Sequence, residues 1–236
     1  MGPSTALGTI MQNKYLYIAL IHYPVKNKNG EVVSTAITNL DLHDMARAAK
    51  TYGVKGYYII NPMAAQRELA ERIIRHWTEG FGASYNPNRG EALSIIKIVP
   101  EFRDALSEIE RETGARPKVM ATAAREAEGV KEDRDSEIPP TPIYQRGASG
   151  DLTKGDRVIG FEQAREVINA GPSVIAFGTG WGLTDEFIGS CDFRLPPIRG
   201  AGGEGGRFTG STGGGYNHLP VRSAAAIILD RLAGER

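Results

Sequence analysis

The sequence predicts an α/β fold built on a parallel sheet. Short apolar runs of strand length alternate along the chain with amphipathic segments of helical period. Strands that alternate with helices are joined by crossover connections, which make neighbouring strands parallel and cover both faces of the sheet. The chain has 236 residues, 41% of them hydrophobic, enough for a substantial core without disulfides or a structural metal. We therefore expect one domain, over residues 11–236.

The first half of the chain supplies three predicted strands and three predicted helices. The run at 15–21 is continuously apolar, as expected for a strand buried on both faces of a sheet. The predicted strands are residues 15–21, 56–60 and 93–99. The predicted helices are residues 41–52, 64–77 and 101–113. Each predicted helix lies between two predicted strands or next to one, as crossover connections require.

The second half continues the same alternation and ends on a helix. The predicted strands are residues 118–121, 173–177 and 191–195, and the predicted helices are 161–169 and 221–232. Asn217 or His218 can cap the last helix, and Pro220 fits its first turn. The small residues at 223–226 would let another backbone pack closely. Such a face serves oligomerisation or plain core packing, and spacing alone does not decide between them.

Two polar segments interrupt this rhythm. Residues 26–30 form a polar turn, and residues 127–155 form a charged excursion that contains both proline and glycine. We expect both to be mobile surface loops. They are either tolerated insertions or elements that grip a substrate.

Composition excludes several classes of protein. Lys+Arg and Asp+Glu balance at 28 each, so any contact with RNA must come from local clusters of charge. The single cysteine, Cys191, predicts a reduced and partly buried thiol in a cytoplasmic protein. No apolar run is long enough to span a membrane. Residues 1–10 lack the pattern of a signal peptide, and we expect them to be a disordered leader or an added segment before Met11. No cluster has the spacing of metal ligands, so we expect no metal.

Three glycine- and proline-bearing turns in the last third carry most of the functional signal. They are 177–183 (Phe-Gly-Thr-Gly-Trp-Gly-Leu), 195–200 (Leu-Pro-Pro-Ile-Arg-Gly) and the segment from Tyr216 into the last helix. Glycine lets a backbone approach a ligand closely, so such turns bind a ligand mainly through backbone N–H and C=O groups. This kind of binding suits a nucleoside or an adenosyl cofactor. The turn at 177–183 comes too late for an ordinary dinucleotide fold. The Gly-x-Gly-x-x-Gly match within 200–215 is expected by chance, and the middle of that run reads as a flexible tether.

Three segments together resemble the motifs of SPOUT, or α/β-knot, RNA methyltransferases. They are residues 38–54 (Thr-Asn-Leu-Asp-Leu-His-Asp-Met-Ala-Arg-Ala-Ala-Lys-Thr-Tyr-Gly-Val), 177–183, and 218–227 (His-Leu-Pro-Val-Arg-Ser-Ala-Ala-Ala-Ile). The last is similar to the terminal motif of the tRNA (guanine-N1)-methyltransferase catalytic domain. The first resembles the ribose-2′-O branch, in which an arginine near Arg47 is functional. From residue 15 onward the chain is similar to a stand-alone bacterial SPOUT subfamily.

The resemblance implies a fold, a cofactor and partners. It implies a parallel-sheet α/β-knot fold with a C-terminal trefoil knot, S-adenosylmethionine as methyl donor, an RNA substrate, and a homodimer formed through the C-terminal helix. The positions that it assigns to donor binding are Phe177, Gly178, Thr179, Gly180, Gly182, Leu195, Ile198, Gly200, Asn217, His218, Leu219 and Val221.

The chain also departs from the ribose branch. Asp41 stands where that branch commonly has asparagine, Arg222 stands where it has serine, and the usual glutamate is missing from 178–182. Nor does the chain carry the extra tRNA-gripping domain of the guanine-N1 enzymes. The acceptor atom therefore stays open between a base and a ribose.

Methyl transfer requires a positioned nucleophile that loses a proton, and several side chains are candidates. Asp41, His43 and Asp185 are candidate bases, while Arg47 and Arg222 could orient a phosphate or stabilise negative charge. Each has a structural alternative. Asp41 can simply favour the helix dipole, His43 can be a surface residue, and Arg47 can pair with Asp41 or Asp44, while His218 can cap a helix or line the donor pocket.

Charged surfaces add a weaker signal. The arginines at 67, 72 and 75 alternate with glutamates, which is typical of a solvated helix face. Better candidates for RNA contact lie on loops, at Lys26, Lys28, Arg125, Lys131 and Arg134. Three functions remain: a donor-dependent RNA methyltransferase, an adenosyl- or nucleotide-binding module without transfer activity, and a dimeric scaffold.

Overall fold

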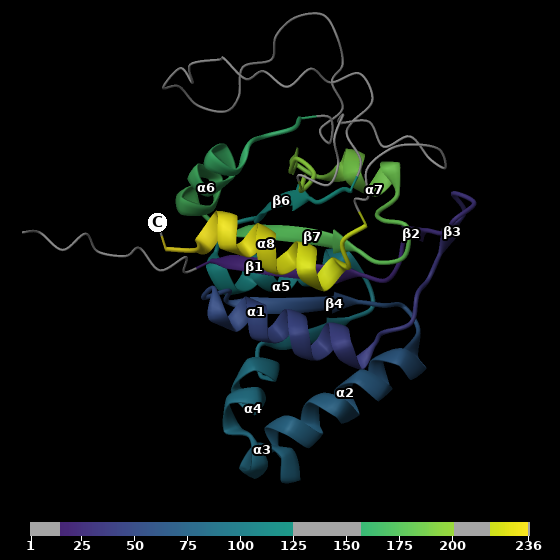
Figure 1. Ribbon diagram of the computed structural model, residues 1–236, viewed down its shortest axis with the longest axis vertical. Helices are drawn as coiled ribbons and strands as arrows, with labels where there is room; N and C mark the ends of the chain where they lie inside the picture. Colours follow the sequence, from purple (N-terminus) through teal and green to yellow (C-terminus); the bar gives the residue numbers. More distant parts are fainter. Residues whose placement is uncertain (1–14, 125–156, 201–217, 236) are drawn as a thin grey trace, which may run out of the picture.

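A computed structural model describes residues 15–124, 157–200 and 218–235. Its centre is a six-stranded sheet in the order β5-β4-β1-β7-β6-β8, and every neighbouring pair is parallel (Figure 1). The strands are β1 (Leu16–Ile21), β4 (Gly56–Ile60), β5 (Ile96–Val99), β6 (Lys118–Ala121), β7 (Ser173–Gly178) and β8 (Phe193–Arg194). The predicted parallel α/β sheet is confirmed.

The sheet separates two hydrophobic cores because side chains alternate along each strand. On β1, Leu16, Ile18 and Leu20 face the core covered by α1 (Ala46–Thr51), α6 (Phe161–Ala170) and α8 (Val221–Ala233). The intervening side chains face the core covered by α5 (Phe102–Thr113) and α7 (Asp185–Ser190). All six residues of β1 are buried, so the central strand has no solvent-facing side.

Two predicted strands are shorter than expected. The run at 93–99 begins its strand only at Ile96, because Leu93 ends the short helix α4 (Pro87–Leu93). The run at 191–195 pairs with β6 only over Phe193–Arg194. The other four predicted strands agree with the structure to within one residue at each end.

The predicted helices are all present. The helix predicted at 41–52 begins with a π-helical turn, η1 (Asp41–Met45), which continues into α1. The helix predicted at 64–77 is α2 (Ala64–Thr78). The cap predicted for the last helix is wrong: Pro220 occupies the N-cap position of α8, and His218 precedes it.

Five short elements have no counterpart among the predictions. They are β2 (Val25–Lys26), β3 (Val32–Val33), α3 (Phe81–Tyr85), α4 and α7. The polar turn at 26–30 belongs to the hairpin of β2 and β3. The helices α3 and α4 fold back onto Trp77, where a Cβ atom on Gly82 would lie 2.6 Å from the indole ring. Tertiary contacts therefore stabilise these elements, and local sequence gives little sign of them.

The small face of the last helix is divided between core and surface. Ala225 is fully buried within its own chain, beside Ile228 and Leu229, so the core-packing alternative holds there. Ser223 lies on the exposed side of the same helix. Only this outward side is available to another chain.

Several predictions fall outside the described residues. These are the leader at 1–10, the loop at 127–155, the tether within 200–215 beyond Gly200, and the residues Asn217, Arg125, Lys131 and Arg134. In the described part of the chain, no helix is both long and apolar enough to cross a membrane.

Candidate functional site

The candidate site lies where the strand order reverses, between β1 and β7. Successive strands run outward from β1 through β4 to β5, whereas β7 and β6 lie on its other side. In open parallel sheets, ligands bind outside the carboxyl ends of the strands at such a switch point. His22 follows β1 and Thr179 follows β7, and the Thr179 N–H donates to the carbonyl oxygen of Ile21 at 3.2 Å.

The glycine-rich turn after β7 is held by the hairpin that follows β1. The Lys26 N–H donates to the carbonyl of Gly182 at 2.9 Å, and the Trp181 N–H donates to the carbonyl of Lys26 at 3.0 Å. Gly180 and Gly182 have positive φ angles of 59° and 102°, which side-chain-bearing residues rarely adopt. A Cβ atom on Gly178 would lie 2.6 Å from the backbone nitrogen of Leu183. The conformation of this turn therefore requires its glycines.

Lys26 also engages Asp185, a candidate base. Its Nζ atom lies 2.6 Å from Oδ2 of Asp185, and the aspartate side chain is 88% exposed. Asp185 stands at the start of α7, after Thr184, whose side chain accepts a hydrogen bond from the N–H of Phe187. The interaction ties α7 to the hairpin, so part of the charge that we predicted for RNA contact at Lys26 is already compensated.

Two threonines connect the turn after β7 to His22. The Thr179 hydroxyl donates to the carbonyl of Ile21 at 3.0 Å and lies 2.5 Å from the Thr35 hydroxyl. The Thr35 hydroxyl in turn lies 3.0 Å from Nδ1 of His22 and 3.5 Å from the His22 carbonyl oxygen. The network therefore engages Nδ1 of the imidazole ring.

His22 is completely buried, and its Nε2 atom has no hydrogen-bond partner among the residues that the structure describes. Burial lowers the pKa of His22 to about 4, although the nearby Asp41 opposes this shift. The imidazole is therefore neutral near pH 7. An unpaired buried polar atom costs about 1–3 kcal/mol, and native structures seldom tolerate one without a reason.

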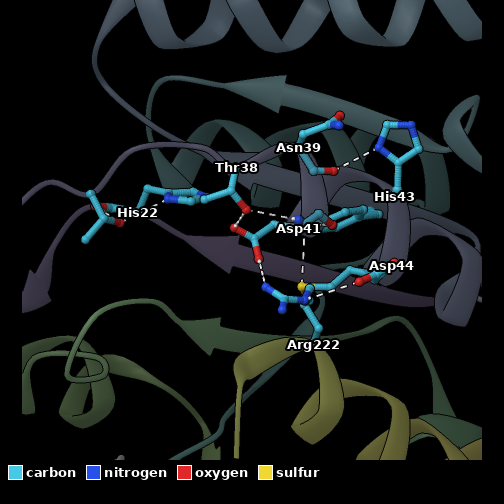
Figure 2. A network of polar contacts seen from close by, with 10 residues as sticks. His22, Thr38, Asn39, Asp41, His43, Asp44 and Arg222 are labelled. Atoms are coloured by element: carbon cyan, nitrogen blue, oxygen red, sulfur yellow. Dashed lines mark hydrogen bonds and ion pairs between the residues drawn. The ribbon is translucent and has the colours of Figure 1, made fainter.

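Asp41 and Arg222 meet beside this network. Nη1 of Arg222 lies 3.5 Å from Oδ1 of Asp41, and its Nε lies 3.3 Å from Oδ2 of Asp44. The Thr38 hydroxyl donates to Oδ2 of Asp41 at 2.6 Å and accepts from the Asp41 N–H, as a helix cap does. Figure 2 shows Arg222 reaching from α8 to both carboxylates. The contacts of Asp41 therefore agree with both of its predicted roles. It lies in the first turn of a helix, and its carboxylate also contacts Arg222, another candidate site residue.

Arg47 and His43 take different positions from those expected. Arg47 forms no ion pair with Asp41 or Asp44 within the described parts of the chain, so the predicted pairing is wrong and Arg222 fills that place. The ring of His43 meets Trp77 edge to face at 5.6 Å, and its Nδ1 bonds to the carbonyl of Asn39 at 2.8 Å. His43 is thus a packing residue of the first helix.

The predicted donor-binding positions differ in exposure. Phe177 and Leu195 are buried in the core, so only their backbone can face a ligand. Ile198 and Val221 are half-buried against the same core. The exposed positions are Gly180, Gly200, His218 and Leu219.

Sequence reasoning missed His22 and Thr35, and it gave Thr38, the first residue of the motif at 38–54, no role of its own. One local signal was available, because a histidine directly after a fully apolar parallel strand lies at the carboxyl edge of the sheet. The threonines carry no such signal. Among the described residues, no group of three histidines, cysteines or carboxylates could hold a metal ion.

Comparison with known proteins gives one family. A family model described as SAM-dependent RNA methyltransferase matches residues 15–139 and 144–234. Two curated relatives, from Oleidesulfovibrio alaskensis and Nitratidesulfovibrio vulgaris, are named tRNA (guanine-N(1)-)-methyltransferase and are 40% and 38% identical over 93% of this chain. The chain spans only 42% of their length. An uncharacterized Aquifex aeolicus protein is 34% identical over 94% of this chain and 90% of its own length.

Solved structures agree on the fold. A probable methylase family protein from Haemophilus influenzae has a TM-score of 0.51 and 16% identity, with 94% of this chain and 66% of that chain covered. A probable methyltransferase from Bordetella pertussis has a TM-score of 0.52 and 15% identity, with 94% and 96% covered. At these identities the likeness concerns the fold alone.

Proposed function

Because the chain belongs to the family of SAM-dependent RNA methyltransferases, we propose that it transfers a methyl group from S-adenosylmethionine (SAM) to a base or ribose of tRNA or rRNA. One observation supports this most directly. A continuous set of contacts joins the glycine-rich turn after β7, through Thr179 and Thr35, to His22, and the charge of the nearby Asp41 acts on the pKa of His22. Asp41 in turn contacts Arg222. Three distant segments thus converge at the usual ligand edge of a parallel sheet.

The glycine-rich turn fits an adenosyl ligand. Gly178 leaves no room for a Cβ atom, and Gly180 and Gly182 hold positive φ angles, so this turn offers backbone rather than side chains. When bound, SAM would supply an electrophilic methyl group on a sulfonium. The residues that we propose to hold it are Phe177, Gly178, Thr179, Gly180, Gly182, Leu195, Ile198, Gly200, Asn217, His218, Leu219 and Val221.

Arg222 and Arg47 are proposed to position the RNA. Asp41 and Asp44 engage Nη1 and Nε of Arg222, which leaves its Nη2 donors without a partner among the described residues. A guanidinium fixed from one side can present those donors to a phosphate or to a base oxygen. Arg47 is exposed and has no ion-pair partner among the described residues.

The acceptor nitrogen or hydroxyl must also lose a proton as its bond to the methyl carbon forms and the sulfur–carbon bond breaks. Asp41 and Asp185 are the proposed acceptors or orienting groups for that proton. Asp41 has the stronger support, because it lies in the network at the carboxyl edge, whereas Asp185 contacts Lys26.

The fold and assembly extend this proposal. We propose that residues 11–236 form a single SPOUT domain whose C-terminal segment threads a trefoil knot, and that two copies associate through the outward side of α8. The six-stranded sheet and the packing of α8 on η1 and α1 support one domain. The exposed Ser223 beside small residues supports close approach of a second helix.

Transfer of labelled methyl from SAM to RNA tests the function. The purified chain is incubated with tRNA and rRNA from cells lacking its gene, and the RNA is digested to nucleosides. A methylated nucleoside above background supports the proposal, and its identity distinguishes base from ribose. Binding of S-adenosylhomocysteine without transfer to either RNA would instead favour a cofactor-binding module.

A further inference from the structure

A polar pocket of about 200 Å³ lies where α1 meets the start of α4, and its lining contains no carboxylate. Arg47, Asn86, Asn88 and Arg89 form it. The nearby lysine of α1, Lys50, is already paired with Glu91 of α4 at 3.1 Å. Neither Arg47 nor Arg89 has an ion-pair partner among the residues that the structure describes. The pocket therefore presents two uncompensated guanidinium groups.

Packing around Trp77 fixes the position of Arg89. The Arg89 guanidinium lies over the indole ring, 4.3 Å from its centroid, while His43 and His76 meet the ring edge to face. A Cβ atom on Gly90 would lie 2.5 Å from the carbonyl oxygen of Trp77, so α4 packs closely against the end of α2. This contact holds the cation in place before any ligand binds.

Two exposed aromatic rings lie on α3, the short helix that directly precedes the pocket residue Asn86. Phe81 and Tyr85 of α3 are each 75% exposed, their ring centroids lie 6.0 Å apart, and their planes differ by 22°. Tyr85 directly precedes Asn86, which lines the pocket. Figure 1 shows α3 and α4 together at one end of the molecule, below α1. Two large rings at this exposure bury little area in the fold and leave their faces open to a flat partner.

We propose that Arg47, Phe81, Tyr85, Asn86, Asn88 and Arg89 form an RNA-binding surface, here called the α3–α4 surface, which holds one single-stranded nucleotide of the substrate. The phosphate lies between Arg47 and Arg89, and the adjacent base stacks on the ring of Phe81 or Tyr85. This inference rests on the proposed function, since it names a contact of the same enzyme with its RNA.

The chemistry of the pocket matches a phosphate. Guanidinium groups bind phosphate oxygens through paired hydrogen bonds, and amide N–H groups add further donors. Oδ1 of Asn86 accepts from the N–H of Arg89 at 3.1 Å, so its Nδ2 group is the end left to donate. Stacking of bases on aromatic rings tolerates any base, and RNA-binding proteins combine it with cationic pockets along the strand. An apolar protein partner would gain nothing from the two arginines.

Fluorescence anisotropy measures the binding of RNA to the full chain and tests this surface. Two probes are used: a short single-stranded oligoribonucleotide and total tRNA. The double variant Phe81→Ala/Tyr85→Ala should weaken binding of the oligoribonucleotide about tenfold, as expected for loss of one stacked base. Arg89→Gln should weaken both probes and reduce the slope of log affinity against log salt by about 0.7, the value for one phosphate. Tyr15→Ala and Arg103→Gln are matched controls, since both side chains are exposed, Tyr15 directly precedes β1, and Arg103 lies on α5.

The outcomes separate this inference from the proposed function. If the double variant binds the oligoribonucleotide within twofold of the unmutated chain, the surface does not contact RNA and the inference is wrong. If it loses self-association instead, the surface is an interface between copies. If RNA binding depends on the surface but the unmutated chain transfers no methyl group, only the proposed function fails. If the unmutated chain binds neither probe at low salt, the proposed RNA-binding role of the α3–α4 surface is wrong.

Discussion

The guanidinium of Arg222 contacts the carboxylate of Asp41 at 3.5 Å, although 181 positions separate them in the sequence. The contact fastens the start of α8 to the π-helical turn η1, beside His22 at the end of the central strand. At both positions the sequence departs from the ribose-methylating pattern that it resembles. The two departures are linked in the structure, because the positive charge of Arg222 compensates the negative charge of Asp41.

Breaking this pair should affect both stability and catalysis. Asp41 is 5% exposed, so Arg222→Gln leaves a poorly hydrated carboxylate and should lower the free energy of unfolding by about 1–3 kcal/mol. The double variant with Asp41→Asn should cost less than the sum, with a coupling of about 1 kcal/mol. Urea unfolding measures these values. The exposed pair Lys50–Glu91 is the control and should couple by less than about 0.5 kcal/mol.

Catalysis gives the second readout for the same variants. Methyl transfer to RNA should fall, while binding of S-adenosylhomocysteine should persist, because both residues are proposed to act on the RNA acceptor and not on the methyl donor. Unchanged transfer rates in both single variants would leave the pair a purely structural role.

Gly180→Ala should remove donor binding at a modest cost in stability. Gly180 has a φ of 59°, and an added Cβ would lie 3.0 Å from the carbonyl oxygen of Lys26, so the turn must shift. Gly53→Ala is the matched control, since its φ is 68° and nothing lies near its added Cβ. Both should lose about 1–2 kcal/mol of stability. Only Gly180→Ala should lose the rise in Tm on adding S-adenosylhomocysteine. An equal rise in both variants would place the donor elsewhere.

Burial of His22 should make stability depend on pH. Above pH 6.5 the imidazole is neutral in both the folded and unfolded states, so it contributes no pH dependence. Below pH 6.5 the unfolded chain binds a proton first, because burial lowers the folded-state pKa to about 4. The free energy of unfolding should therefore fall by up to about 3 kcal/mol between pH 6.5 and pH 4.

His22→Phe should remove that part of the pH dependence. Unfolding in urea at several pH values compares the variant with the unmutated chain, and His76→Phe, at an exposed position, serves as control. If His22→Phe and His76→Phe change the pH dependence of the free energy of unfolding equally, His22 is not a buried, neutral imidazole in the folded protein.

Assembly should depend on the outward side of α8. Ser223→Glu places a charge at an exposed position of this helix and should shift a dimer toward monomer in sedimentation experiments at micromolar concentration. Ser107→Glu on α5, which covers the opposite face of the sheet, is the control. Ala225→Glu is unsuitable, because Ala225 is buried in its own chain. A monomeric unmutated chain would contradict the proposed homodimer.

Cys191 should resist modification while the protein is folded. The thiol is buried, and burial raises its pKa to about 12, so almost no thiolate exists at neutral pH. A thiol reagent should label it only at the rate of unfolding, and urea should accelerate that labelling. Rapid labelling of the native chain would show that the segment before β8 opens locally.

Local pattern was sufficient for most of the secondary structure. The run at 15–21 is apolar at every position, and its last six residues form the central strand β1, which is buried on both faces of the sheet. The helices α2, α5 and α8 likewise follow from the period of their apolar residues. These features could be predicted because the signal lies within each segment. The short helices α3 and α4 could not, since contacts with Trp77 stabilise them.

The composition of the site was decided by the tertiary structure. The sequence singled out Asp41, Arg47, Asp185 and Arg222 one by one, and chain folding brought only Asp41 and Arg222 into contact. It also placed the buried, unmarked His22 beside them. Residues far apart in sequence carry no shared periodic signal, so which of them meet depends on strand order and helix packing. The sequence by itself determined the elements and their motifs, whereas the parallel order of β4, β1 and β7 determined which side chains share one edge of the sheet.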